Sequence, residues 1–169
     1  MDVAAEYGNY SSDLTRTVPV SGIFSDRQKA VYQSVLDVKN EATKLLIPGT
    51  IWKEYHTEVG KIMTKQLLKL GLLDKADLQN ETIEKPAYKK YFMHGTSHHI
   101  GLDTHDYGLL HLPMVPNMVF TVEPGIYIPK EGFGVRLEDD VVIQKTGAPI
   151  NLMESIPIEI EEIETLMNA

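Results

Sequence analysis

The chain has 169 residues, 43% of them hydrophobic, which is enough for one domain with a sizeable core. The formal net charge is −8, and no cluster of lysine and arginine forms a stripe, so the charge pattern argues against a nucleic-acid partner. The absence of cysteine excludes disulfides, thiolate zinc sites and thiol nucleophiles, and the lack of a membrane-length apolar run or a signal peptide predicts a cytoplasmic protein without membrane contact.

The first segment reads as a β-hairpin. Residues 3–20 are rich in Val, Tyr and Thr, and Gly8–Asn9 lies in the middle of the segment. This composition predicts two short strands joined by a tight turn.

Two long helices are expected next. Ser25 suits a helix N-cap, and an apolar stripe at helical spacing runs from there to Leu46: Val31, Val35, Val38, Ala42 and Leu45. Thr50 is expected to cap a second helix that ends near Gly71. Its inward side chains are predicted to be Trp52, Tyr55, Val59, Ile62, Leu67 and Leu70.

The second half of the chain predicts mostly strands. Residues 72–90 are polar and aperiodic, which indicates a surface connection. Residues 118–128 predict a strand, a turn at Pro124–Gly125 and a further strand, and residues 134–144 predict another. A short acidic helix is expected over residues 158–168. This order predicts an α+β fold, with two long helices on one face of a mostly antiparallel sheet.

Chemistry-bearing residues gather in four places. The stretch "HGTSHHIGLDTHD", residues 94–106, holds four of the chain's six histidines. Asp2 and Asp13 lie eleven residues apart across the predicted hairpin, where strand alternation can aim both at one face. Glu123 ends a strand, and Glu138 lies within the last strand segment.

Asp2, Asp13, His98, Glu123 and Glu138 form a candidate metal set. Four carboxylates and one imidazole match the charge of two divalent cations, and without metal such carboxylates would repel one another. Oxygen-rich ligation with one histidine favours Mn²⁺, Co²⁺ or Fe²⁺ over a structural Zn²⁺ site.

Each residue also has a simpler interpretation. Asp13 can pair with Arg16 on the surface, and Glu123 can be an exposed strand-end carboxylate. Residues 138–140, "EDD", can be a solvated acidic run. Composition and spacing alone leave the choice open, because any acidic protein offers many sets of five such residues.

Four motifs, in order, resemble the metal-site signatures of the Xaa-Pro aminopeptidases: "DVAAEYGNYSSDLTRTVPVSG", "HGTSHHIGLDTHD", "TVEPGIYI" and "VRLEDDVVI". The resemblance covers essentially the whole chain and implies the pita-bread fold shared with methionine aminopeptidase, prolidase and creatinase. It implies that Asp2, Asp13, His98, Glu123 and Glu138 are the metal ligands, and that Asp13 and Glu138 bridge two ions. The cofactor it implies is a pair of divalent ions, most simply Mn²⁺, with Co²⁺, Fe²⁺ or Zn²⁺ as alternatives.

The resemblance also implies the reaction. A hydroxide held between the two ions attacks the first peptide bond of a substrate that has proline in second position. Glu123 matches the general base, and His105 is placed to stabilise the oxyanion. His94 is expected to shape the proline pocket and Arg136 to orient a carboxylate ligand.

The remaining histidines have no role that the resemblance names. His99 and His111 are expected to be structural. His56 is expected on the polar face of the second helix.

Two departures from the family pattern stand out. Pro116–Asn117 replaces the usual Pro-Gly turn, and asparagine tolerates the left-handed conformation that such a turn needs. Residues 1–169 match only the C-terminal part of the family's catalytic domain, with its N-terminal domain and the first half of the fold absent. We therefore expect a frayed Asp2, weak or partial metal occupancy, low or absent activity, and homo-oligomers that cover exposed surface.

Two other functions stay open at this point. A prolidase-type dipeptidase would share the same ligands, and release of proline from dipeptides alone would identify it. A non-catalytic pita-bread protein that binds a partner is the third possibility, and metal analysis would separate it from both enzymes.

Overall fold

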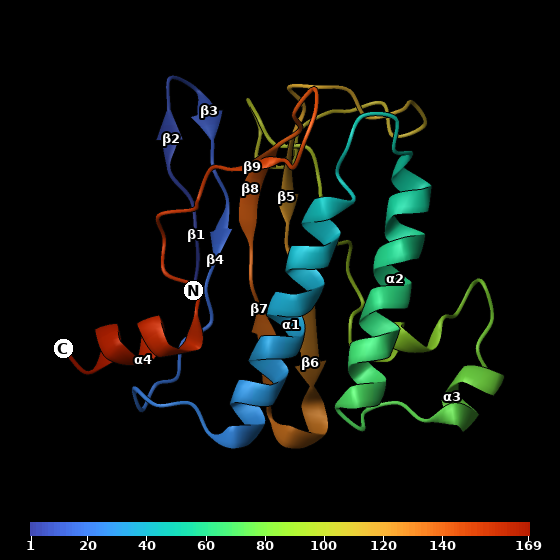
Figure 1. Ribbon diagram of the computed structural model, residues 1–169, viewed down its shortest axis with the longest axis vertical. Helices are drawn as coiled ribbons and strands as arrows, with labels where there is room; N and C mark the ends of the chain where they lie inside the picture. The colour runs from blue at the N-terminus through green and yellow to red at the C-terminus, as the bar shows by residue number, and fades with distance from the viewer.

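The computed structural model describes residues 1–169 as strands backed by two long helices (Figure 1). Helices α1 (Asp26–Lys44) and α2 (Trp52–Lys69) lie side by side, and α1 covers one face of strands β5, β6 and β7, whose bounds follow below. The predicted α+β arrangement is confirmed. None of the helices combines the length and the apolar character needed to cross a membrane.

The N-terminal hairpin is made of four short strands in one register. β1 (Asp2–Val3) pairs with β4 (Leu14–Thr15), and β2 (Glu6–Tyr7) pairs with β3 (Tyr10–Ser11), all antiparallel. The turn lies at Gly8 and Asn9, as predicted, and both have positive φ, 60° and 69°. Asn and Gly favour this conformation in two-residue hairpin turns.

A second, longer hairpin forms the centre of the molecule. β5 (Val119–Val122) pairs with β8 (Asp139–Val142), and β6 (Gly125–Ile128) pairs with β7 (Phe133–Arg136). The single strand predicted over residues 134–144 is therefore wrong, because it is broken at residues 137–138. The partner strand breaks at residues 123–124, so Glu123 and Glu138 occupy facing positions in the same interruption.

The helix ends follow local side-chain chemistry. Ser25 caps α1 in a reciprocal capping box with Gln28, as predicted at this position. Thr50 does not cap α2, because its hydroxyl donates to the carbonyl of Leu45 at 3.0 Å and Ile51 occupies the N-cap. Gly71 follows the end of α2 with φ 69°.

The connection over residues 72–90 is more ordered than its composition predicts. It contains α3 (Lys75–Gln79) and the 3₁₀ helix η1 (Ala87–Lys90). The Asp74 carboxylate accepts from the amides of Ala76 and Asp77, which starts α3 without an apolar stripe.

One hydrophobic core joins the helices to the sheet. β9 (Ile150–Asn151) pairs with β8, and the chain ends in α4 (Ile160–Met167), close to the predicted helix. The α1 stripe packs into this core, although Leu45 is only partly buried. Asn117 has φ 71°, so the turn beside Pro116 keeps the left-handed residue that was predicted.

Candidate metal centre

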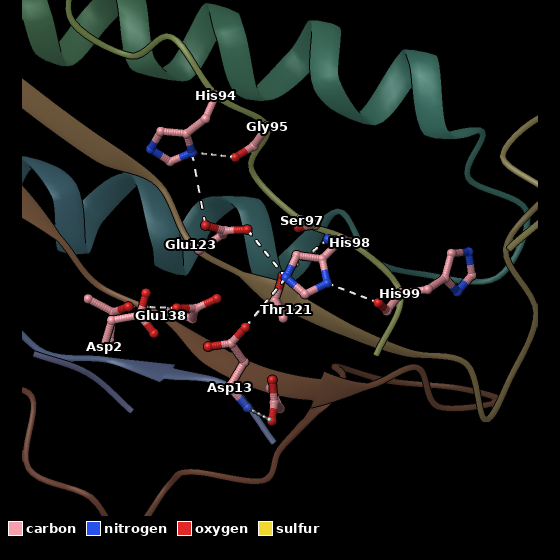
Figure 2. A network of polar contacts seen from close by, with 12 residues as sticks. Asp2, Asp13, His94, Gly95, Ser97, His98, His99, Thr121, Glu123 and Glu138 are labelled. Atoms are coloured by element: carbon pink, nitrogen blue, oxygen red, sulfur yellow. Dashed lines mark hydrogen bonds and ion pairs between the residues drawn. The ribbon is translucent and has the colours of Figure 1, made fainter. Parts of the chain in front are cut away.

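All eight residues predicted for the site line one pocket of about 420 Å³. They are Asp2, Asp13, His94, His98, His105, Glu123, Arg136 and Glu138, joined by Gly95 and Ser97. The N-terminal hairpin, the histidine stretch and the broken central hairpin each contribute side chains, which converge from different sides (Figure 2). The fold thus brings together groups that lie up to 136 positions apart in the sequence.

The histidine stretch is held against strand β5 by main-chain hydrogen bonds. The Thr121 amide donates to the His98 carbonyl at 3.0 Å, and the Glu123 amide donates to the Thr96 carbonyl at 2.7 Å. On the other side, the buried Tyr55 hydroxyl of α2 lies 2.8 Å from the Ser97 hydroxyl. The position of His98 is therefore fixed by both the sheet and the helix.

His98 presents a free nitrogen to the carboxylates. Its Nδ1 lies 2.9 Å from the carbonyl oxygen of His99, an acceptor, so Nδ1 must donate and the neutral ring leaves a lone pair on Nε2. That Nε2 lies 3.7 Å from Asp13 Oδ2 and 3.6 Å from Glu123 Oε1 (Figure 2). Potential ligand atoms of Asp13, His98 and Glu138 all lie within 4.8 Å of one another.

The electrostatics of the cluster are those of a site built for cations. Burial raises the pKa of Glu123 to about 7 and that of Glu138 to about 8, and neighbouring carboxylates add to both shifts. Burial also raises the pKa of Asp13 and lowers that of His98, which keeps the imidazole neutral. Neutral imidazole and crowded carboxylates are the donors that a divalent ion needs, so these residues fit such an ion.

Asp2 is more firmly held than the sequence predicts. Strand β1 pairs with β4, and the main chains of Met1 and Arg16 exchange hydrogen bonds of 2.8 and 3.0 Å. The expected fraying is therefore wrong for the backbone. The Asp2 side chain stays 60% exposed and is bound by the Arg136 guanidinium.

The other predicted histidines lie at the rim of the pocket. His94 Nδ1 lies 2.8 Å from the Gly95 carbonyl, and its Nε2 lies 2.7 Å from the Tyr127 hydroxyl, so both ring nitrogens are engaged. The exposed His105 ring lies 4.2 Å from the His98 ring, centroid to centroid. Both side chains can therefore reach a molecule bound in the pocket without being needed to form the carboxylate cluster.

The simpler interpretations of the acidic residues do not hold. Asp139 and Asp140 are buried, so the acidic run is not solvated. Arg16 pairs with Asp139 rather than with Asp13, at 2.7 Å. The half-buried His56 packs edge-on against Trp52, which contradicts its expected place on a polar helix face.

Three supporting residues were not found from the sequence. The Thr15 hydroxyl donates to Glu138 Oε2 at 2.6 Å, and Thr121 Oγ1 accepts from the His98 amide at 3.1 Å. Tyr127 holds His94. Thr15 and Tyr127 each lie an even number of positions from a candidate ligand, so strand alternation was the available signal.

Comparison with known proteins identifies the family. The model of metallopeptidase family M24 matches residues 1–145. The chain is 42% identical to the Xaa-Pro aminopeptidase of Escherichia coli (strain K12), with 100% of this chain and 40% of the relative covered. It is 40% identical to the Xaa-Pro aminopeptidase of Haemophilus influenzae, with 99% and 41% covered.

Solved structures agree with the curated relatives. The aminopeptidase PepP of Pseudomonas aeruginosa matches with a TM-score of 0.88 at 39% identity, covering 99% of this chain and 40% of that one. Two structures of Escherichia coli aminopeptidase P match with a TM-score of 0.87 at 42% identity and the same coverage. One is the zinc-substituted enzyme with product, and the other is the enzyme with the inhibitor Pro-Leu. The fold is therefore part of the pita-bread fold, and the chain spans about two fifths of the length of these relatives.

Proposed function

The chain belongs to metallopeptidase family M24, and we propose that it carries the metal centre of an aminopeptidase that releases the N-terminal residue from peptides with proline in second position. The observation that carries this proposal is the convergence of Asp13, His98 and Glu138 donor atoms within 4.8 Å. The free Nε2 of His98 faces two carboxylates there. The names of the relatives support the substrate class.

The proposed ligands of two divalent ions are Asp2, Asp13, His98, Glu123 and Glu138. Asp13 and Glu138 are proposed to bind both ions, and the crowding of their oxygens around His98 supports this assignment. Mn²⁺ is the proposed metal because oxygen donors dominate the set. When bound, such ions supply a water activated for attack at neutral pH and polarise the scissile carbonyl.

The protein's own groups position the peptide and move the proton. Glu123, with its pKa raised by burial, is proposed to take a proton from the attacking water and deliver it to the leaving proline nitrogen. His105 is proposed to donate a hydrogen bond to the carbonyl oxygen as negative charge develops there. His94, fixed by Tyr127, is proposed to contact the proline, and Arg136 to hold Asp2.

We further propose that residues 1–169 correspond to the C-terminal part of the relatives' catalytic domain, since the chain covers 40% of the Escherichia coli enzyme. Activity, substrate and partners of the whole enzyme are therefore part of the proposal. The cytoplasmic location stays a prediction, and one relative is named as mitochondrial.

Metal analysis and peptide hydrolysis test the proposal together. The purified chain is incubated with excess Mn²⁺, desalted and analysed by mass spectrometry for metal content. About two equivalents are expected from a two-metal site, and none would overturn the proposal in favour of a non-catalytic binding protein. In an active form of the enzyme, cleavage of a tripeptide Xaa-Pro-Xaa separates an aminopeptidase from a dipeptidase, which would release proline only from the dipeptide.

A further inference from the structure

A buried ion cluster lies beside the candidate metal centre. Adjacent residues of an extended segment point to opposite sides, and Asp139 points away from the pocket that Glu138 lines. Its carboxylate is bound by Arg16 at 2.7 Å and by the ammonium group of Lys39 from α1. Arg16, Lys39 and Asp139 are 6%, 5% and 1% exposed.

Stability alone does not explain this ion cluster. Burying ion pairs costs desolvation energy, and replacing them with apolar side chains of similar size is often neutral or stabilising. What distinguishes Arg16 is the direction and number of its hydrogen bonds. Its guanidinium makes five, and four of them go to main-chain carbonyls.

These carbonyls belong to three separate segments of the chain. Nη1 donates to Thr15 at 3.0 Å and to Glu138 at 2.8 Å, while Nε donates to Pro157 at 2.8 Å and Nη2 to Ile156 at 3.4 Å. Arg16 thus joins the N-terminal hairpin, the break in the central hairpin and the segment before α4.

Two of these four carbonyls belong to Thr15 and Glu138, the two residues whose hydrogen bond orients the Glu138 carboxylate, a proposed metal ligand. The Glu138 amide donates to the Thr15 carbonyl at 3.0 Å, and the Thr15 hydroxyl donates to Glu138 Oε2 at 2.6 Å. The β5–β8 ladder begins only at Asp139, so Glu138 pairs instead with Thr15 through an isolated antiparallel bridge. Arg16 Nη1 donates to the carbonyls of both partners of this bridge, so it restrains the only backbone pairing that Glu138 makes to the N-terminal hairpin.

We propose that Arg16, locked by Asp139, is a positioning residue that fixes the break in the central hairpin and so aims the Glu138 carboxylate into the pocket. The consequence for metal rests on the proposed function, but the restraint on the backbone does not. A lysine at position 16 would keep the charge and lose the planar fork that reaches several carbonyls at once.

The test compares Arg16→Lys with Arg27→Lys in the full chain. Arg27 is the control, because its guanidinium also binds a carboxylate, that of Glu131, and donates to the Leu70 carbonyl, while neither Arg27 nor Glu131 lines the pocket. Two quantities are measured: Mn²⁺ affinity by calorimetry, and amide hydrogen exchange in the metal-free chain. The informative amides are those of Glu138 and Asp13, whose acceptors are the Thr15 carbonyl and the Asp140 carboxylate.

Arg16→Lys is expected to speed exchange at both amides by roughly tenfold and to weaken Mn²⁺ binding by about 10–100-fold, the scale for residues that orient metal ligands. Arg27→Lys is expected to change neither quantity. A folded Arg16→Lys chain with unchanged exchange at both amides overturns the proposal, whatever its stability.

The two measurements, Mn²⁺ affinity and amide hydrogen exchange, test the proposed function and the role of Arg16 separately. A wild-type chain that binds no Mn²⁺ contradicts the metal centre, and the exchange measurement then decides the role of Arg16 by itself. If Arg16→Lys does not fold, Asn151→Ala replaces it. The side-chain amide of Asn151 donates to the Asp139 carboxylate at 2.8 Å, so its removal loosens the carboxylate that holds Arg16. Faster exchange at the Glu138 and Asp13 amides supports the proposal in that variant, and unchanged exchange overturns it.

Discussion

Asp13 and Glu138 occupy the centre of the carboxylate cluster, and removing either is expected to damage both ion sites. The predicted result for Asp13→Ala or Glu138→Ala is loss of the bound metal pair, measured as metal equivalents after desalting. Glu131→Ala is the control, because Glu131 lies on the exposed surface, away from the pocket. Retention of two equivalents in Glu138→Ala would contradict its proposed role at both ions.

His105 is expected to behave differently from the ligands. It lies in the exposed part of the histidine stretch and lines the pocket, while its ring is not needed to bring the carboxylates together. In an active form of the enzyme, His105→Ala should keep its metal and lose about 10²-fold in kcat, the scale of one oxyanion donor. Loss of metal in this variant would place His105 among the ligands instead.

The buried carboxyls also predict how stability depends on pH. Between the ordinary value of 4.5 and the raised pKa values of about 7 for Glu123 and about 8 for Glu138, these two carboxyls bind more protons in the folded metal-free chain than in the unfolded chain. Their contribution to the free energy of unfolding therefore falls as pH rises through this window.

The half-buried histidines, whose pKa values burial lowers, oppose this trend below their ordinary value of 6.5. Thermal melts in a chelator should therefore show a Tm that falls from about pH 6.5 to pH 8, with a smaller fall when Mn²⁺ is present. The double variant Glu123→Gln and Glu138→Gln should flatten the dependence. A Tm that rises with pH over this window in the chelator would contradict the assignment of these two carboxyls.

At the scale of residues, the sequence predicted which side chains form the site better than it predicted the contacts that support them. The resemblance of four motifs to the Xaa-Pro aminopeptidases, rather than spacing alone, singled out all eight residues that line the pocket. The ion cluster of Arg16, Lys39 and Asp139 was not predicted, since its members lie up to 123 positions apart and meet only through tertiary packing.

At the scale of elements, helix α1 is held against the core by its apolar stripe. Val38 is fully buried in the core that joins the helices to the sheet, so Val38→Asp would place an unpaired carboxylate there. We predict that this chain does not fold, as read from circular dichroism and the soluble fraction. Asn40→Asp, on the exposed side of the same helix, is the control and should remain folded. A folded Val38→Asp chain would mean that the stripe tolerates charge.

Periodicity explains which elements the sequence could predict. The helices α1 and α2 repeat apolar residues over several turns, whereas α3 is five residues long and begins with a capping box formed by Asp74 and Asp77. The break that divides β7 from β8 is invisible in the alternating pattern, because Leu137 and Glu138 continue it. Yet Glu123 and Glu138 occupy facing positions in this break, so the proposed ligands coincide with the departure from regular pairing.

At the scale of the whole molecule, large apolar side chains remain uncovered. The hairpin tip exposes Tyr7 at 92%, and the loop after the histidine stretch exposes Tyr107 at 83%. Leu109, Leu110 and Leu112 in the same loop are also exposed. Exposed apolar surface of this kind recruits partners, and we predict that the chain forms dimers or larger oligomers in solution, measured as mass by light scattering.

The lining of the pocket predicts that this chain alone hydrolyses peptides slowly. No hydrophobic residue lines the pocket, so a proline ring finds no apolar wall within it, and Asp2 remains largely exposed. Weak binding of the proline side and incomplete restraint of one ligand should together make hydrolysis slow. Turnover of an Arg-Pro-Pro peptide with added Mn²⁺ measures this, with Glu138→Ala as the blank. We expect a rate barely above that blank, and a monomer with robust metal-dependent turnover would show that these 169 residues are sufficient for catalysis.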